Sequence, residues 1–321
     1  MTVYLHIGSP KCGSTTIQSL LAANRAPLGE AGLHLHPDEN FAHEVGHQFV
    51  RGWLSDAQRR DRTDEIRALS DEGMGDIVLS SETYMAIGAK RETLDTFLSL
   101  FGRREIRVLA VMRSPAALLE STWFQWMRTY RRFDKVRQTV AQAGFSFPRY
   151  LETGWFERID RNWQTWAHHP RIARFTPILM DQGGRLDFAR ILDDFLDRRA
   201  MRLPAETAEN ESMNGVTFRL LKQYRQAPLE SYESFVSQLD RRMSSLGYGR
   251  YRLFIDGVRA RIHTHCRDLP LFAPFADSVP SYPSAAALPE ETFEELLEIS
   301  RELARTFAPK APQAAEGSRT A

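Results

Sequence analysis

The sequence predicts an α/β protein in which a doubly wound parallel sheet carries a helical carboxy-terminal subdomain. Two observations indicate this class. Short apolar runs typical of strands alternate with longer segments of helical periodicity, which is the pattern of βαβ units. From about Phe188 onward the pattern is almost entirely helical, and no linker rich in Pro, Gly or Ser separates this part from the rest. We therefore expect a single domain over residues 1–308, with the helical subdomain beginning near residue 188.

The individual elements follow from these patterns in chain order. Strands are expected where β-rich apolar runs are bounded by Gly, Pro or charge, at residues 3–7, 77–80, 108–112 and 172–179. Helices are expected where apolar residues recur with a period of 3.6, at residues 14–25, 93–101, 115–131, 156–167, 186–198, 216–225, 232–246, 253–265 and 290–307. Residues 309–321 are rich in Ala, Pro and polar residues, so we expect a disordered tail there.

Composition excludes several classes of protein. The chain has 42 basic and 41 acidic residues, a net charge of +1, so no overall field would hold it on nucleic acid or on an anionic membrane. No apolar run approaches the roughly 18 residues of a membrane span, and the amino terminus lacks the pattern of a signal peptide. The two cysteines, Cys12 and Cys266, are too few for a disulfide framework. We expect a cytoplasmic protein without a membrane span or a nucleic-acid partner.

The first predicted strand runs directly into a glycine loop and then into a helix. The segment reads Gly8-Ser-Pro-Lys-Cys-Gly-Ser-Thr-Thr16. Backbone N–H groups of such a loop and of the first helical turn have no internal partners, and the helix dipole favours negative charge at the same point. This arrangement predicts a phosphate-binding cradle and a sheet of P-loop type.

The position of the lysine separates this loop from that of a nucleoside triphosphatase. In the triphosphatase loop the lysine follows the second glycine. Here Ser14 occupies that position, and Lys11 lies inside the loop between Pro10 and Cys12. The displaced lysine argues against the standard ATP-binding loop.

The run Pro10-Lys-Cys-Gly-Ser-Thr15 resembles the 5′-phosphosulfate loop of the sulfotransferase family, and of its soluble bacterial-type members in particular. The resemblance implies binding of 3′-phosphoadenosine 5′-phosphosulfate, with adenosine 3′,5′-bisphosphate as the product. It assigns the 5′-phosphosulfate to the loop and first helical turn, that is, to Lys11, Cys12, Gly13, Ser14, Thr15 and Thr16. Cys12 stands at a variable position of the family motif, and we interpret it as a small residue that fills the loop.

A second motif lies after the predicted strand at residues 108–112. Arg113 follows that strand, Ser114 and Pro115 suit the start of a helix, and Ser121 comes eight residues after Arg113. A guanidinium offers a fixed fork of donors to a phosphate, and a hydroxyl adds another. This pattern resembles the 3′-phosphate motif of the same family, which implies that Arg113 and Ser121 bind the 3′-phosphate.

The resemblance predicts a sulfotransferase that moves a sulfuryl group to a hydroxyl or amine. Lys11 is expected to stabilise the charge on the leaving oxygen, and no metal is expected to be required. Glu82, after the strand at residues 77–80, is the expected general base. The rivals for that role are four histidines between the loop and this strand: His34, His36, His43 and His47.

Several points stay open at the level of the sequence. The acceptor is a glycan, a lipid or a small metabolite. Further phosphate ligands are sought among Arg250, Arg252, Arg259 and Arg261. The oligomeric state is unknown.

Two alternatives come from other classes of protein. The glycine loop also suits a nucleotide-binding, kinase-like protein, which would bind ATP with magnesium. His43-Glu44-Val-Gly-His47 is an H-E-x-x-H sequence, which on a helix suits a zinc hydrolase with Glu44 as base.

Overall fold

The computed structural model describes residues 1–9, 12–50, 62–70, 75–129, 153–180, 187–197, 215–224, 227–248, 256–275, 285 and 288–309. The chain divides into two compact units. The first comprises residues 1–119, 146–211 and 260–280, and the second comprises residues 120–145, 212–259 and 281–321. The segment after Phe188 therefore contributes to both units. The expected tail beyond residue 309 lies outside the described residues.

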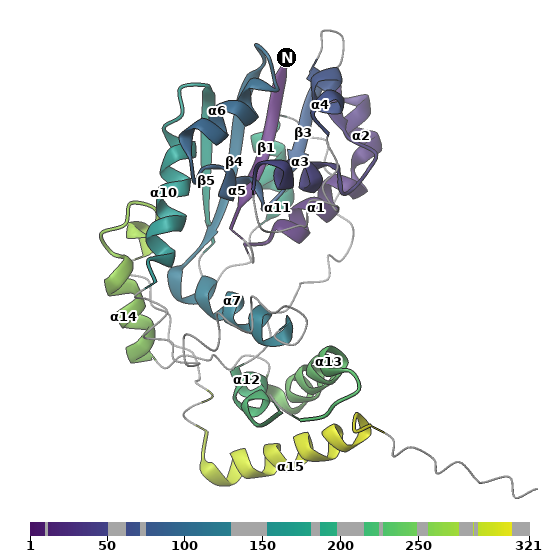
Figure 1. The fold of residues 1–321 in the computed structure, drawn as a ribbon, viewed down its shortest axis with the longest axis vertical. Helices are drawn as coiled ribbons and strands as arrows, with labels where there is room; N and C mark the ends of the chain where they lie inside the picture. The colour runs from purple at the N-terminus through teal and green to yellow at the C-terminus, as the bar shows by residue number, and fades with distance from the viewer. Residues whose placement is uncertain are drawn as a thin grey trace, which may run out of the picture. The chain divides into compact units, whose positions relative to one another are not determined.

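A parallel sheet forms the centre of the first unit (Figure 1). Its described strands are β1 (Thr2–Gly8), β2 (Leu33–Leu35), β3 (Asp76–Ser80), β4 (Glu105–Arg113) and β5 (Ile172–Met180). They lie in the order β2-β3-β1-β4-β5, and every neighbouring pair is parallel. The predicted α/β class with a parallel sheet is confirmed. The sequence missed β2, because three residues are too few to show a periodic pattern.

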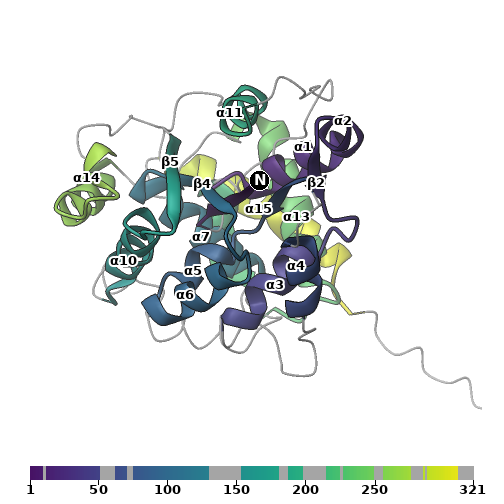
Figure 2. The ribbon, with the colours of Figure 1, turned by 90° about the horizontal axis from the view of Figure 1, so that it is seen from above.

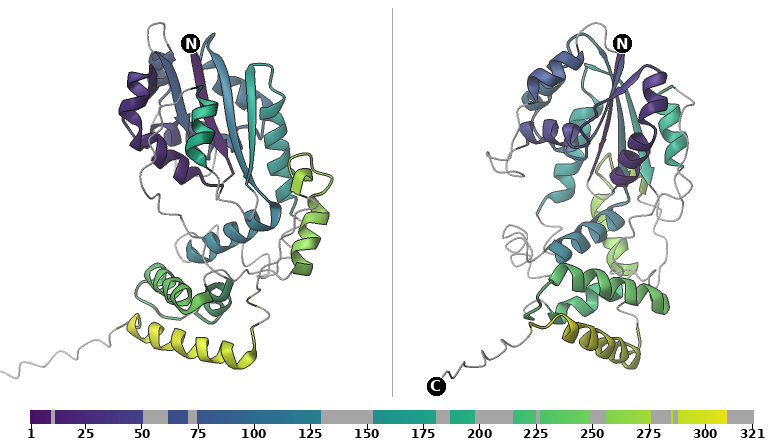
Figure 3. Two further views of the ribbon diagram at one scale, coloured as in Figure 1. Left: turned by 180° about the vertical axis from the view of Figure 1, so that it is seen from behind. Right: turned by 90° about the vertical axis from the view of Figure 1, so that its right-hand side faces the viewer.

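Helices cover both faces of this sheet, as expected of a doubly wound arrangement. Figure 2 shows α1 (Ser14–Ala23), α2 (Arg25–Glu30) and α11 (Phe188–Phe195) on one face. The opposite face carries a second set of helices: α3 (Phe41–Phe49), α4 (Thr63–Ser70), α5 (Tyr84–Ile87), α6 (Arg91–Ser99) and α10 (Trp155–Ala167). The right-hand view of Figure 3 also shows the purple α1 and α2 on one side of the sheet and the blue α3 and α4 on the other. All seven residues of β1 are buried, because a central parallel strand has both faces covered.

The strand order places a topological switch point between β1 and β4. After β1 the chain passes through α1 and α2 toward β2, beyond β3, whereas after β4 it continues to β5 on the other side. Open α/β sheets bind ligands outside the carboxyl ends of strands at such a point. Gly8 at the end of β1 is in register with Val111 of β4. The glycine loop follows the end of β1 and Arg113 is the last residue of β4, so both lie at the strand ends where a ligand is expected.

The second unit is helical within the described residues. It contains α12 (Gly215–Leu221), α13 (Tyr232–Met243) and α15 (Glu290–Thr306), while α7 (Pro115–Thr129) and α14 (Asp256–Cys266) each contribute to both units. Phe235 anchors its core, with ring centroids 5.0 Å from Tyr224 and 5.8 Å from Phe307. In the part of the chain that is described, no helix combines the length and apolar character needed to cross a membrane.

Candidate functional site

The predicted phosphate loop joins β1 to α1. The described backbone runs to Ser9 and resumes at Cys12, whose N–H donates a hydrogen bond to the Ser9 carbonyl at 3.2 Å. Lys11, the residue expected to act on the leaving oxygen, and Pro10 lie outside the described residues. The strand, turn and helix start therefore occur where the sequence predicted them, whereas the structure gives no position for the lysine.

Gly13 caps the amino end of α1 in a left-handed conformation. Its φ is 80°, a value that favours glycine because a Cβ would crowd the backbone. A Cβ at this position would also lie only 2.8 Å from Cζ of Phe188 on α11. The second glycine of the motif is thus required both by the turn and by the close approach of α11.

Ser14 begins α1, and its hydroxyl is oriented into the protein without a partner there. The residue is 5% exposed, and its Oγ has no hydrogen-bond partner among the described residues. A buried polar atom of this kind costs free energy unless a ligand or a water satisfies it. Thr15 is exposed and Thr16 is half-buried, so both hydroxyls of the next two residues are nearer to solvent.

His6 on β1 adds a second unsatisfied polar atom beside the loop. Its Nε2 and the Ser14 Oγ lie 3.8 Å and 3.7 Å from the point that a Cβ on Gly8 would occupy. Nε2 has no partner within the described part of the chain, whereas Nδ1 lies 2.7 Å from Oγ of Ser80. Burial lowers the pKa of His6 to about 3, so the imidazole is neutral near pH 7. The sequence analysis missed this residue, although a histidine within an otherwise apolar buried strand was a usable signal.

Cys12 fills the loop rather than presenting a reactive thiolate. The residue is fully buried, and burial raises the pKa of its thiol to about 12. Interactions with the backbone of Arg113 and of Ser9 oppose this rise only in part. The interpretation of Cys12 as a small loop-filling residue therefore agrees with its surroundings.

Two charged groups near the loop shift the pKa of the Cys12 thiol. The positive charge of Arg113 lowers its pKa, and the negative charge of Glu82 raises it. Arg113 ends β4, and Glu82 follows Ser80, the last residue of β3. The structure thus brings three predicted site residues from three strand ends close enough to interact electrostatically. Ser121 lies on α7 in the second unit and is buried.

Two of the rival histidines form a contact pair on α3. Nε2 of His43 lies 2.7 Å from Nε2 of His47, and Nδ1 of His43 lies 3.5 Å from Oγ of Ser81. Burial lowers the pKa of His43, whereas the negative charges of Glu82 and Glu44 partly oppose that shift. His43 is therefore kept largely neutral, in the protonation state that a general base needs, and it lies close to Glu82.

The same pair is the one that the zinc alternative needs. Its two Nε2 atoms lie 2.7 Å apart, at a hydrogen-bond distance. Glu44, the base of the zinc alternative, forms an ion pair with Arg62 at 2.6 Å. Among the described residues, no group of three His, Cys, Asp or Glu is placed to hold a metal ion.

A pocket of about 550 Å³ lies beside the loop in the first unit. Thr15 and Gln18 of α1, Ser80 of β3 and His43 of α3 are among the residues that line it. His36 lines it too, whereas His34 and His47 are not among the lining residues. Of the four rival histidines, the structure places two on the pocket wall.

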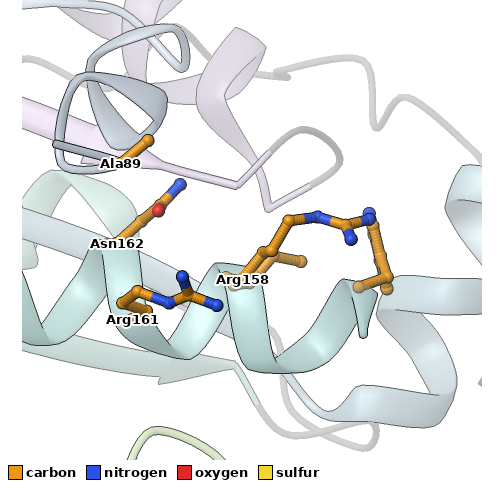
Figure 4. Close-up of a pocket in the computed structure, with 6 residues that line it drawn as sticks. Ala89, Arg158, Arg161 and Asn162 are labelled. Atoms are coloured by element: carbon orange, nitrogen blue, oxygen red, sulfur yellow. The ribbon is translucent and has the colours of Figure 1, made fainter. Parts of the chain in front are cut away.

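A smaller pocket of about 320 Å³ lies along α10 (Figure 4). Arg158 and Arg161 on its wall are exposed, and Asn162 is oriented toward Ala89. It shares no lining residue with the larger pocket and none with the loop. The candidate site is therefore the larger pocket together with the loop.

The four arginines proposed as further phosphate ligands have different surroundings. Arg259 is fully buried and forms an ion pair with Glu120 at 3.1 Å in the second unit. Arg261 is exposed on α14. Arg250 and Arg252 lie outside the described residues. The guanidinium of Arg259 thus pairs with a buried carboxylate of the protein itself, which gives Arg259 a structural role.

The chain matches no family model, no curated protein and no solved structure.

Proposed function

We propose that the chain is a sulfotransferase that uses 3′-phosphoadenosine 5′-phosphosulfate as donor. The observation that supports this proposal most directly is the buried Ser14 hydroxyl without a described partner at the start of α1. It follows a tight loop at the switch point of a parallel sheet, where α/β proteins bind nucleotides. The displaced Lys11 and the Arg113 motif favour the phosphosulfate donor over a nucleoside triphosphate.

The residues of the first turn suit an anionic group. The free N–H groups at the start of the ten-residue helix α1 and the hydroxyls of Ser14, Thr15 and Thr16 would hold the 5′-phosphosulfate. Arg113 would hold the 3′-phosphate. Lys11 would stabilise the charge that develops on the leaving phosphate oxygen.

The acceptor side needs a base that removes one proton. Bound donor supplies a sulfuryl group whose bond to the bridging phosphate oxygen can break. The acceptor oxygen or nitrogen forms the new bond to sulfur, its proton passes to the base, and the electron pair of the broken S–O bond stays on the departing nucleotide. Glu82 remains our candidate base, and His43 is its rival because it lines the adjacent pocket with a lowered pKa.

Isothermal titration calorimetry distinguishes this proposal from the kinase-like alternative. We expect adenosine 3′,5′-bisphosphate to bind without magnesium, and to bind more tightly than ATP with magnesium. Binding of ATP only in the presence of magnesium, without binding of the bisphosphate, would refute the sulfotransferase proposal.

Substitution of Lys11 tests its role in transfer. Lys11→Ala is expected to lower kcat at least 100-fold while the circular dichroism spectrum stays unchanged, because the loss of a charge at the leaving oxygen costs about 3 kcal/mol or more. Lys90→Ala, at an exposed lysine before α6, is the matched control and should retain full activity. Equal turnover of the two variants would remove Lys11 from the mechanism.

A further inference from the structure

Two buried polar atoms at the start of the candidate site lie around the same point. The Cβ that an alanine at position 8 would carry lies 3.8 Å from Nε2 of His6 and 3.7 Å from Oγ of Ser14. His6 is 1% exposed and Ser14 is 5% exposed. Neither atom has a hydrogen-bond partner within the described part of the chain. The protein thus holds two unsatisfied polar atoms close together at the loop, and burial keeps both away from bulk water.

The geometry of β1 explains why these two atoms are close. Side chains two residues apart on a strand lie on one face of the sheet, so His6 and Gly8 share a face. Ser14 is the first residue of α1, the helix that follows the loop. A Cβ at position 8 would also lie 3.2 Å from the carbonyl oxygen of Val111. Glycine at this position therefore places no side chain of its own between the imidazole and the hydroxyl.

Ser80 fixes the orientation of the His6 ring. Nδ1 of His6 lies 2.7 Å from Oγ of Ser80, the last residue of β3. Beside this contact, the N–H of Ser81 donates to the His6 carbonyl at 3.1 Å, which joins the two strands. Burial lowers the pKa of His6 to about 3, so the ring is neutral near pH 7. A neutral imidazole has one donor and one acceptor nitrogen, so the role of Nδ1 toward Ser80 sets the role of Nε2.

An anion at the amino end of α1 would select one of the two neutral forms of this ring. An anionic oxygen only accepts hydrogen bonds, so the Ser14 hydroxyl contributes to its binding only by donating its proton to it. The Ser14 oxygen can then only accept a hydrogen bond from His6. This arrangement requires the proton on Nε2, while Nδ1 accepts from the Ser80 hydroxyl. With the proton on Nδ1 instead, the ring would accept the Ser14 proton and direct it away from the anion.

We propose that His6 is a positioning residue of the anion site, whose Nε2–H donates to Ser14 Oγ when an anion is bound and so directs the Ser14 hydroxyl proton toward that anion. The hydrogen bonds then run in one direction, from Ser80 through His6 and Ser14 to the ligand. Hydrogen bonds in such a chain polarise and strengthen one another where the local dielectric constant is low. The inference rests on the proposed function, because it takes the 5′-phosphosulfate as the ligand of the loop.

A double-mutant cycle tests whether His6 acts through Ser14. The wild type, His6→Asn, Ser14→Ala and the double variant are titrated with adenosine 3′,5′-bisphosphate by calorimetry. His6→Asn keeps an amide for Ser80 but has no group at the position of Nε2, so we expect its Kd to rise about tenfold. In the Ser14→Ala background the same substitution is expected to change Kd by less than about twofold, because the hydroxyl that it orients is gone. Equal effects in both backgrounds, or no effect in either, would overturn the inference.

His6→Gln separates positioning from a purely structural role. Its side-chain amide reaches the position of Nε2 rather than that of Nδ1, so it can donate to Ser14 although it loses the contact with Ser80. We expect it to bind the bisphosphate within about threefold of the wild type, even where urea denaturation shows it to be as destabilised as His6→Asn. His168→Asn, at an exposed histidine after α10, is the matched control. If His6→Gln binds no better than His6→Asn, His6 has a structural role only.

Nitrogen NMR reports the position of the ring proton directly. Correlation spectra of protein labelled with ¹⁵N-histidine distinguish the two ring nitrogens, and the signals that His6→Gln lacks belong to His6. We expect the proton on Nε2 once adenosine 3′,5′-bisphosphate is bound. A proton on Nδ1 in that complex, or a ring protonated at both nitrogens near pH 7, would overturn the inference.

Inorganic sulfate keeps this inference separate from the proposed donor. If the wild type does not bind the bisphosphate, the proposed function fails, and the cycle and the NMR measurement are carried out with sulfate as the probe. Sulfate binding that weakens in His6→Asn only when Ser14 is present would support the inference without the proposed function. Sulfate binding that His6→Asn leaves unchanged would overturn the inference, and failure of the wild type to bind either probe would overturn both.

Discussion

Acidification is expected to destabilise the protein through His6, the buried imidazole of the central strand β1. Burial places its pKa at about 3 in the folded chain, against 6.5 for a histidine exposed to water. Between these values the unfolded chain binds a proton that the folded chain does not. The contribution of His6 to stability is therefore complete above pH 6.5, and it is lost progressively as the pH falls toward 3.

The size of this effect follows from the two pKa values. One unit of pKa difference corresponds to about 1.4 kcal/mol, so the loss between pH 7 and pH 5 amounts to about 2 kcal/mol from His6 alone. That is a large fraction of the roughly 5–15 kcal/mol by which folded proteins are usually stable. The change is within reach of urea denaturation followed by tryptophan fluorescence.

His6→Asn isolates the contribution of this one residue. The asparagine amide retains a polar partner for Ser80 Oγ, which lies 2.7 Å from Nδ1 of His6, but it does not titrate. The variant is expected to be less stable than the wild type at pH 7, and to lose about 2 kcal/mol less than the wild type between pH 7 and pH 5. His168→Asn, at an exposed histidine after α10, is the matched control for removing one imidazole. If wild type and His6→Asn show the same pH dependence within about 0.5 kcal/mol, the imidazole accepts a proton in the folded protein and our account of its burial is wrong.

Three further predictions concern other residues. Glu120→Gln is expected to lower the free energy of unfolding by about 3–5 kcal/mol, because it removes the negative charge from the buried ion pair with Arg259; a loss below about 1 kcal/mol in urea denaturation would contradict this. Gly13→Ala is expected to cost about 1–3 kcal/mol, since its φ of 80° and the contact with Phe188 at 2.8 Å both oppose a Cβ, and thermal unfolding measures the loss. Cys12 is expected to resist iodoacetamide at pH 8 in the folded protein and to react after denaturation, because burial raises the pKa of its thiol to about 12; rapid alkylation of the native chain, seen by mass spectrometry, would show that the loop opens.

The glycine loop shows how far local sequence patterns reach. The end of β1 and the start of α1 at Ser14 occur where the motif predicts them, because their conformation depends on residues within one turn. The central strand β4 was predictable for a similar reason, since its nearly continuous apolar run is typical of a strand buried on both faces.

Local sequence patterns could not predict which residues the site residues contact. His6 contacts Ser80, which is 74 residues further along the chain, and the charges of Arg113 and Glu82 act together on Cys12. Hydrophobic periodicity indicates which face of an element is buried, but not which distant element covers it. The unsatisfied Nε2 of His6 and the role of Arg259 in a buried ion pair could therefore be seen only in the folded chain.

The sequence by itself determined the α/β class, the approximate bounds of the longer strands and helices, and the position of the glycine loop, because each depends on local periodicity and turn chemistry. Only the tertiary structure decided the strand order, the edge strand β2, the division into two units and the pocket that Gln18, Arg25 and His43 share. These features arise from packing between segments far apart in the chain, where the free energy depends on shape and on buried polar partners that no local pattern specifies.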